Sequence, residues 1–145
     1  MRVVLDTNIL VRAAASPLGP AARVLGELTS GTHTLITSPY ILAEVFRVLS
    51  YPRLQARWPL TQGQIHNYLT LLADIAEVVV PAAAHPVVGT DPDDDPVIQT
   101  SVCAGANVLC TRDRHLLDAA VVEYCERPGV RVMEEVELLR LLSSG

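Results

Sequence analysis

Short runs of apolar, often β-branched residues alternate along the chain with longer stretches in which apolar positions recur every three or four residues. The short runs predict strands at 2–5, 34–37, 77–80, 108–110 and 130–133. The longer stretches predict helices at 7–15, 21–29, 39–49, 61–73, 95–104, 114–120 and 134–142. The chain is therefore expected to alternate between strands and helices.

Local signals mark several helix ends. Ser38 is a favourable N-cap and Pro39 a favourable first-turn residue for the helix through about residue 49. Pro52 is expected to end that helix. Gly105 is expected to end the helix that Asp95 opens.

Strands separated by helices imply right-handed crossovers and a mostly parallel sheet covered on both faces. We expect an α/β fold, a three-layer α/β/α sandwich with about five strands. No internal repeat, low-complexity tract or interdomain linker interrupts the pattern, so residues 1–145 are expected to form a single domain.

The composition indicates an aliphatic core, because half of the residues are apolar and only one Trp and one Phe are present. The three cysteines form no CxxC pair, and Cys103 and Cys110 lie in apolar segments, where a thiol usually packs as a small hydrophobe. Unpaired cysteines favour a reducing, cytoplasmic location. No apolar run approaches the length of a membrane span, so we expect no membrane association.

The net charge of −5 is unevenly distributed. Residues 1–73 carry six arginines and three carboxylates, whereas residues 74–145 carry five arginines and thirteen carboxylates. Four of these carboxylates are crowded into residues 91–95. Such crowding is unfavourable unless the charges are solvated or neutralised by cations.

Three acidic residues stand where parallel strands end or where the facing helices begin. Asp6 follows the first strand directly, Asp113 follows the strand 108–110 after two residues, and Asp95 opens the preceding helix. Ligands of open parallel sheets collect at the carboxyl ends of the strands. For any one of these residues taken alone, helix capping is the simpler explanation, but it does not explain why three should gather at one edge.

Glu44 is a carboxylate on an otherwise apolar helix face, beside Ile41, Val45 and Val48. A carboxylate in that stripe is expected to be at least partly buried, which is costly unless it is paired or binds metal. A salt bridge to Arg47, three residues later, is the simpler alternative.

Four segments, in order and over nearly the whole chain, resemble the PIN-domain ribonucleases, and most of all the toxin components of toxin–antitoxin pairs. They read VVLDTNILV from residue 3, SPYILAEV from 38, DPDDDPVI from 91 and VLCTRDRHLL from 108. The resemblance implies a metal-dependent endoribonuclease that leaves a 3′-hydroxyl and a 5′-phosphate. It also implies an RNA substrate, a small antitoxin partner and a homodimer.

The resemblance assigns catalysis and metal binding to an acidic quartet: Asp6, Glu44, Asp95 and Asp113. It makes Asn8 and Thr111 supporting residues, and His115 departs from the family pattern because relatives often have an aspartate there. Hard carboxylate oxygens suit Mg²⁺ or Mn²⁺. Candidate contacts to RNA phosphates are four arginines of the basic half: Arg12, Arg47, Arg53 and Arg57.

Other functional classes fit the residues less well. A receiver-type signalling domain needs a lysine, and all eleven basic residues here are arginines. A haloacid-dehalogenase-like phosphatase needs Asp-x-Asp after the first strand, and the third residue here is Asn8. Two alternatives remain open: a non-catalytic PIN-like module that binds RNA or protein, and an RNA-processing nuclease without an antitoxin.

Overall fold

A computed structural model of the protein describes residues 1–81 and 95–144 and contains a five-stranded sheet. Its strands are β1 (Arg2–Leu5), β2 (Thr34–Thr37), β3 (Glu77–Val78), β4 (Val108–Cys110) and β5 (Arg131–Met133). They lie in the order β3-β2-β1-β4-β5, and each neighbouring pair is parallel. All five predicted strands are present, although β3 stops two residues earlier than expected.

The helices of the described residues are α1 (Thr7–Ala15), α2 (Pro20–Leu28), α3 (Pro39–Leu49), α4 (Pro52–Arg57), α5 (Gln62–Ile75), α6 (Asp95–Cys103), α7 (Ala119–Glu126) and α8 (Glu135–Ser143). The predicted helix ends are confirmed at two sites. The Ser38 side chain accepts a hydrogen bond from the Ile41 N–H. Gly105 follows α6 with φ +62°, a conformation that glycine adopts without a side-chain penalty.

Two predictions of helix position need correction. Pro52 does not merely follow the end of α3: it starts α4, a helix that the sequence analysis missed, because a first-turn proline has no N–H to lose. The helix predicted at 114–120 is wrong. Residues 114–118 form turns, in which the N–H groups of Leu116 and Leu117 bond back to the Asp113 carbonyl, and α7 begins only at Ala119. The predicted loop that ends at residue 90 and three of the crowded aspartates (Asp91, Asp93 and Asp94) lie outside the described residues.

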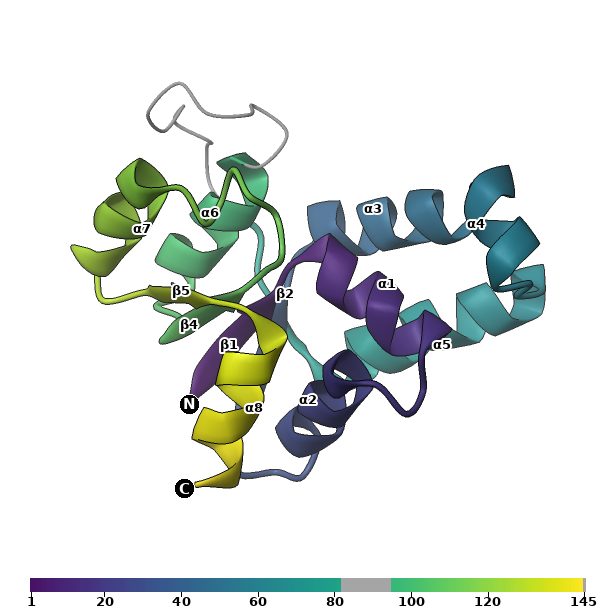
Figure 1. The fold of residues 1–145 in the computed structure, drawn as a ribbon, viewed down its shortest axis with the longest axis horizontal. Coiled ribbons are helices and arrows are strands. Elements are labelled where there is room, and N and C mark those ends of the chain that lie inside the picture. The colour runs from purple at the N-terminus through teal and green to yellow at the C-terminus, as the bar shows by residue number, and fades with distance from the viewer. Residues whose placement is uncertain (82–94, 145) are drawn as a thin grey trace.

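The helices cover both faces of the sheet, so the predicted three-layer α/β/α arrangement is confirmed. Figure 1 shows α6 and α7 on one side of the sheet and α1, α2, α3 and α5 on the other. On the latter side α1 contacts α2 and α3, and α3 contacts α5, while α8 packs against α2. On the former, α6 contacts β1 and β4, and α7 contacts β5.

The order of the strands reverses between β1 and β4. From β1 the chain passes to β2 and β3 on one side of β1, and it then returns to β4 and β5 on the other. Leu5, the last residue of β1, is in register with Cys110, the last residue of β4. Residues that follow these two strands therefore meet at a topological switch point, where open parallel sheets bind ligands.

The core is aliphatic, as the composition predicted. The central strand β1 buries Val3, Val4 and Leu5 completely, and β4 buries Val108, Leu109 and Cys110 to at least 99%. A strand buried on both faces positions the residue at its end rigidly. Among the described residues, no helix is long and apolar enough to cross a membrane.

Candidate functional site

Asp6 lies at the centre of the switch point, directly after β1. It is only 5% exposed and is the N-cap of α1, with Oδ1 accepting a hydrogen bond of 2.7 Å from the Thr7 N–H. Its own backbone N–H donates to the carbonyl of Cys110 at 2.9 Å and so continues the pairing of β1 with β4. The N-cap role accounts for the hydrogen bond to Oδ1 but not for the position of Oδ2.

Thr111 connects Asp6 to Asp113. The fully buried Thr111 hydroxyl donates to Asp6 Oδ2 at 2.7 Å and accepts from the Asp113 N–H at 2.9 Å. The Asp113 carboxylate in turn accepts from the His115 N–H through Oδ1 at 2.8 Å. One hydroxyl thus fixes both the buried aspartate after β1 and the backbone of the aspartate after β4.

Burial raises the pKa of Asp6 above its ordinary value, and the nearby Asp113 charge raises it further. The hydrogen bonds from Thr111 and Thr7 act against this pKa shift by stabilising the charged form, but they do not cancel it. The site therefore holds a carboxylate whose ionised form is disfavoured by its surroundings and would be favoured by a nearby cation.

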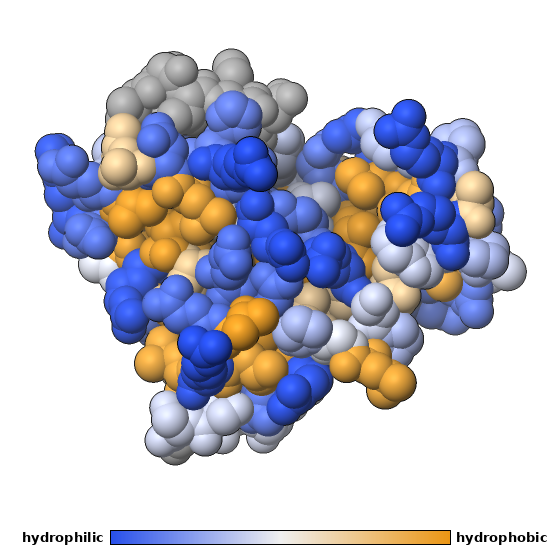
Figure 2. Space-filling model, viewed as in Figure 1, coloured by the Kyte–Doolittle hydropathy of each residue, from blue (hydrophilic) through white to orange (hydrophobic). Residues whose placement is uncertain are grey.

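A pocket of about 410 Å³ opens over these residues. Its polar lining comprises Asp6, Thr7, Asn8, Arg12, Tyr40, Glu44, Arg112 and Asp113. Its apolar lining includes Val48, Leu54 and Trp58, and Figure 2 shows hydrophobic surface between α3 and α4. A hydrophilic band separates that area from the part of the molecule that contains α6 to α8 (Figure 2). The pocket therefore combines carboxylates and guanidinium groups with an apolar side.

Glu44 faces this pocket from α3 and is one-quarter exposed. Both of its carboxylate oxygens accept hydrogen bonds from Arg47, at 2.9 Å to Oε1 and 2.7 Å to Oε2. This pairing lowers the pKa of Glu44, and the Arg47 guanidinium also contacts the Tyr51 hydroxyl and lies 5.2 Å from the centre of its ring. The salt bridge considered as the simpler alternative is thus present, on a residue that also lines the pocket.

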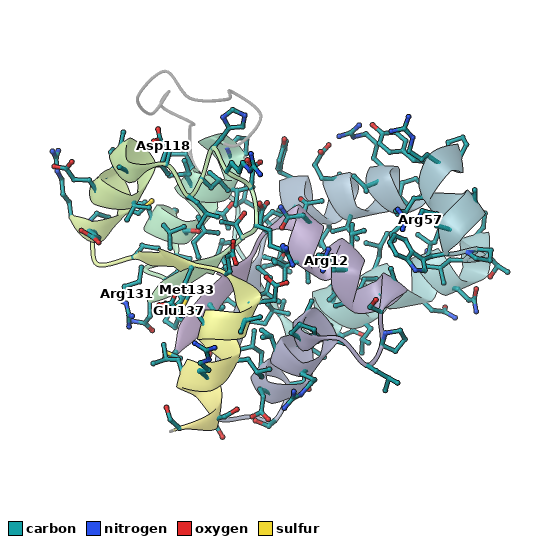
Figure 3. All side chains as sticks on the ribbon, viewed as in Figure 1. Arg12, Arg57, Asp118, Arg131, Met133 and Glu137 are labelled. Atoms are coloured by element: carbon teal, nitrogen blue, oxygen red, sulfur yellow. The ribbon has the colours of Figure 1, made fainter. Side chains whose placement is uncertain are left out.

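A buried carboxylate outside the pocket contacts two of the arginines that line it. Glu135, the first residue of α8, is 1% exposed, and its Oε1 accepts a hydrogen bond from Arg112 Nη1 at 3.0 Å. The same oxygen lies 3.7 Å from Arg12 Nε. Arg112 and Arg12 both line the pocket, and their side chains are 44% and 50% exposed. Figure 3 shows Arg12 on α1, at the centre of the molecule.

Only some of the remaining predicted site residues line the pocket. Asn8 lines the pocket and accepts a long hydrogen bond of 3.5 Å from the Arg112 N–H. Asp95 begins α6, but its side chain is not among those described. Arg53 and Arg57 are exposed on α4 and do not line the pocket, and Arg57 lies 5.1 Å from the Trp58 ring centre. Among the side chains of residues 1–81 and 96–144, no three acidic, His or Cys groups are close enough to bind one ion.

The sequence analysis missed Arg112 and Glu135. The rule that located Asp6 and Asp113 could have found Glu135, because it follows the carboxyl end of β5 by two residues and β5 neighbours β4. Arg112 stands between Thr111 and Asp113, inside a segment already singled out. Nothing local to either residue indicates that the two side chains meet.

Comparisons with known proteins agree with this geometry. A sequence model described as PIN domain matches residues 2–115, and no curated protein gives a significant match. Among solved structures, the chain is similar to a chain in the crystal structure of VapBC2 from Rickettsia felis bound to a DNA fragment from their promoter. The TM-score is 0.60 at 17% identity, over 92% of this chain and 98% of that one. The matched residues include β1, β4, Asp6, Thr111 and Asp113, and the chain belongs to the PIN domain family.

Proposed function

We propose that this protein is a divalent-metal-dependent endoribonuclease and the toxin of a toxin–antitoxin pair. The observation that carries the proposal is the Asp6–Thr111–Asp113 network at the switch point, which keeps two carboxylates beside one pocket in a domain of a family whose members are typically nucleases. An RNA phosphodiester is the substrate that the sequence resemblance implies.

The residues present fit a hard divalent cation. Each oxygen of Asp6 accepts one hydrogen bond and keeps a lone pair for another partner. Among the described residues Asp113 Oδ2 accepts no hydrogen bond, because the one bond of that carboxylate uses Oδ1. Asp6 and Asp113 would hold the ion. The resemblance adds Asp95 and Glu44 as further ligands, and Glu44 would have to exchange its pairing with Arg47 to bind the ion. A bound Mg²⁺ or Mn²⁺ supplies charge neutralisation at the phosphate and activation of water for attack on phosphorus.

The chain's own groups would orient the RNA. The Arg12 and Arg112 guanidinium groups offer N–H donors at the pocket to phosphate oxygens. Trp58 and the neighbouring apolar side chains offer a surface on which a base can stack. Thr111 keeps Asp6 in a fixed orientation, so that little reorganisation is needed when substrate binds.

The direct test is cleavage of a defined RNA with Mg²⁺, with Mn²⁺ and with excess chelator. Asp6→Asn keeps the shape and one acceptor oxygen but removes the charge and replaces the second acceptor with an NH2 donor. Cleavage should fall at least 100-fold, about the effect of removing one electrostatic catalytic group. The matched control is Asp118→Asn, because Asp118 is exposed at the start of α7, outside the pocket (Figure 3).

The control variant should cleave like the wild type. Full activity in chelator, or undiminished cleavage by Asp6→Asn, would contradict the mechanism. A wild-type protein that binds the RNA without cleaving it under any metal condition would instead support the non-catalytic binding module.

The toxin assignment rests on the likeness to a chain of a VapBC2 complex and on the pocket itself. The pocket carboxylates could accept a basic side chain of a small antitoxin, and the apolar side could accept its neighbours. Expression of the chain alone should arrest growth, and co-expression with a neighbouring small reading frame should restore growth and yield a complex. Harmless expression of an active enzyme would favour an RNA-processing nuclease.

A homodimer is part of the same proposal. Phe46 on α3 and Tyr51 after it are each 44% exposed, and aromatic side chains are enriched in the cores of protein interfaces. Phe46→Glu should shift the sedimentation of the protein toward the monomer. Leu18→Glu is the control, because Leu18 is 93% exposed before α2 and should be silent. A wild-type protein that sediments as a monomer at high concentration would refute the dimer.

A further inference from the structure

Glu135 is a buried carboxylate that the proposed mechanism does not use. Its side chain is 1% exposed, it does not line the pocket, and its Oε2 has no hydrogen-bond partner among the described residues. Burying a carboxylate with one oxygen unsatisfied is unfavourable. Its position at the start of α8 offsets part of that cost, because the positive end of a helix dipole stabilises an anion.

Both of its cationic neighbours come from elements that border the site. Arg112 follows β4 and separates Thr111 from Asp113, while Arg12 lies one and a half turns along the helix that Asp6 caps. The two guanidinium groups meet at one atom, Glu135 Oε1, at 3.0 Å from Nη1 of Arg112 and 3.7 Å from Nε of Arg12. Two positive charges so close would repel one another without the anion between them.

The pairing with Glu135 leaves most N–H donors of each guanidinium group available to bind a phosphate. An arginine has five N–H donors, and Glu135 engages one nitrogen of each side chain. Each side chain remains about half exposed and lines the same pocket as Asp6 and Asp113. The trio carries a net charge of +1 beside the acidic residues, which is the sign needed to attract a phosphate.

We propose that Glu135 is a positioning residue that holds Arg12 and Arg112 as a clamp for a backbone phosphate flanking the scissile bond of the RNA. This inference rests on the proposed ribonuclease function; it adds the residue that positions the two arginines and assigns them to the flanking phosphate. Glu135 acts from outside the pocket, through the two arginines. Fixing the guanidinium groups beforehand lowers the conformational entropy lost when the phosphate binds.

A purely structural role is the competing explanation, since the trio also ties α1 and the residues after β4 to α8. The two roles differ in what they change. A structural tie affects the melting temperature and leaves substrate affinity unchanged. A clamp affects the KM with little effect on kcat, because contacts to a flanking phosphate are the same in the ground state and the transition state.

The experiment measures kcat and KM for one RNA with Glu135→Gln, Arg12→Ala and Arg112→Ala, and the Kd for the same RNA in chelator. Glu135→Gln keeps the size and one acceptor but removes the charge. The matched control is Arg131→Ala, which removes an exposed arginine on β5, away from the pocket (Figure 3).

Each clamp variant should raise KM and Kd about tenfold, the effect of losing one charge-assisted contact, with kcat within about twofold. Loss of either arginine should also reduce the salt dependence of binding by about one counterion. In the Arg12→Ala/Arg112→Ala background, Glu135→Gln should change KM no further, because its effect passes through the arginines.

If Glu135→Gln does not fold, Arg12→Ala and Arg112→Ala still test the clamp. They alter half-exposed side chains and should not prevent folding. A wild-type protein that neither cleaves nor binds RNA would overturn the proposed function together with the clamp. If the wild type cleaves RNA but the clamp variants match Arg131→Ala in KM and Kd, the ribonuclease stands and the clamp is wrong.

Discussion

Replacing Thr111 with valine tests the energetic basis of the site, because it removes one hydroxyl and almost nothing else. Valine has nearly the same shape as threonine, and residue 111 is fully buried, so no cavity should form. Asp6 Oδ2 would lose its donor at 2.7 Å, and the Asp113 N–H would lose its acceptor at 2.9 Å.

The expected loss of unfolding free energy follows from these two bonds. A hydrogen bond to a charged group contributes about 1.5–3 kcal/mol, and the Asp113 N–H, which is only partly buried, adds less than the full penalty of an unsatisfied group. We expect Thr111→Val to lower the unfolding free energy by about 2–4 kcal/mol at neutral pH. For a domain of this size, that loss corresponds to a Tm lower by roughly 5–12 °C.

The loss should depend on pH. The Thr111 hydrogen bond lowers the pKa of Asp6, so Thr111→Val should raise that pKa further above its unfolded value. A carboxyl group with a raised pKa destabilises the folded state only when it is ionised. The difference between variant and wild type should therefore be largest above the folded pKa of Asp6, which lies above its usual 3.8, and should shrink as the pH falls through it.

The assay is urea unfolding across pH 4 to 8, and the chain offers two matched substitutions. Thr100 is also fully buried, but its hydroxyl donates to the Pro96 carbonyl inside α6, so Thr100→Val should cost about 0.5–1.5 kcal/mol at every pH. Thr37 is 1% exposed, and its hydroxyl has no partner among the described residues, so Thr37→Val should be neutral or stabilising. A loss at Thr111 that equals the loss at Thr100 and does not change with pH would refute the reasoning.

Three further predictions follow from other contacts. Without metal, Asp6→Asn should raise the melting temperature at pH 7, because burial raises the pKa of Asp6 and its ionised form therefore destabilises the folded state. The gain should vanish at acidic pH, where wild-type Asp6 is protonated, and equal pH profiles of the melting temperature for the two proteins would contradict it. Thr61→Ala should cost about 1 kcal/mol in urea unfolding, because Thr61 and Gln64 form a capping box at the start of α5; a change below the error of the assay would rule out this role. Titration with an aromatic disulfide at pH 8 should modify the exposed Cys103 and spare Cys110, since burial raises the Cys110 pKa; rapid reaction of Cys110 would show that the core opens.

The sequence by itself determined the alternation of strands and helices, except for α4, and the carboxyl edge that collects the acids. Both follow from local signals: fully apolar runs for buried strands, caps for helix starts, and the rule that parallel strands end at one edge. These signals place Asp6 and Asp113 correctly because each stands within three residues of a buried strand. They failed at residues 114–118, where bonds to the Asp113 carbonyl make turns of a segment with helical spacing.

Only the tertiary structure decided which side chains meet across the edge. Thr111 and Asp6 are 105 residues apart along the chain, and Arg112 and Glu135 are 23 apart. These partnerships depend on the register of β1 with β4 and on α8 packing against α2, and no local propensity encodes either. The sequence therefore predicted the residue types of the site, while long-range packing selected the hydroxyl that links two aspartates and the carboxylate that links two arginines.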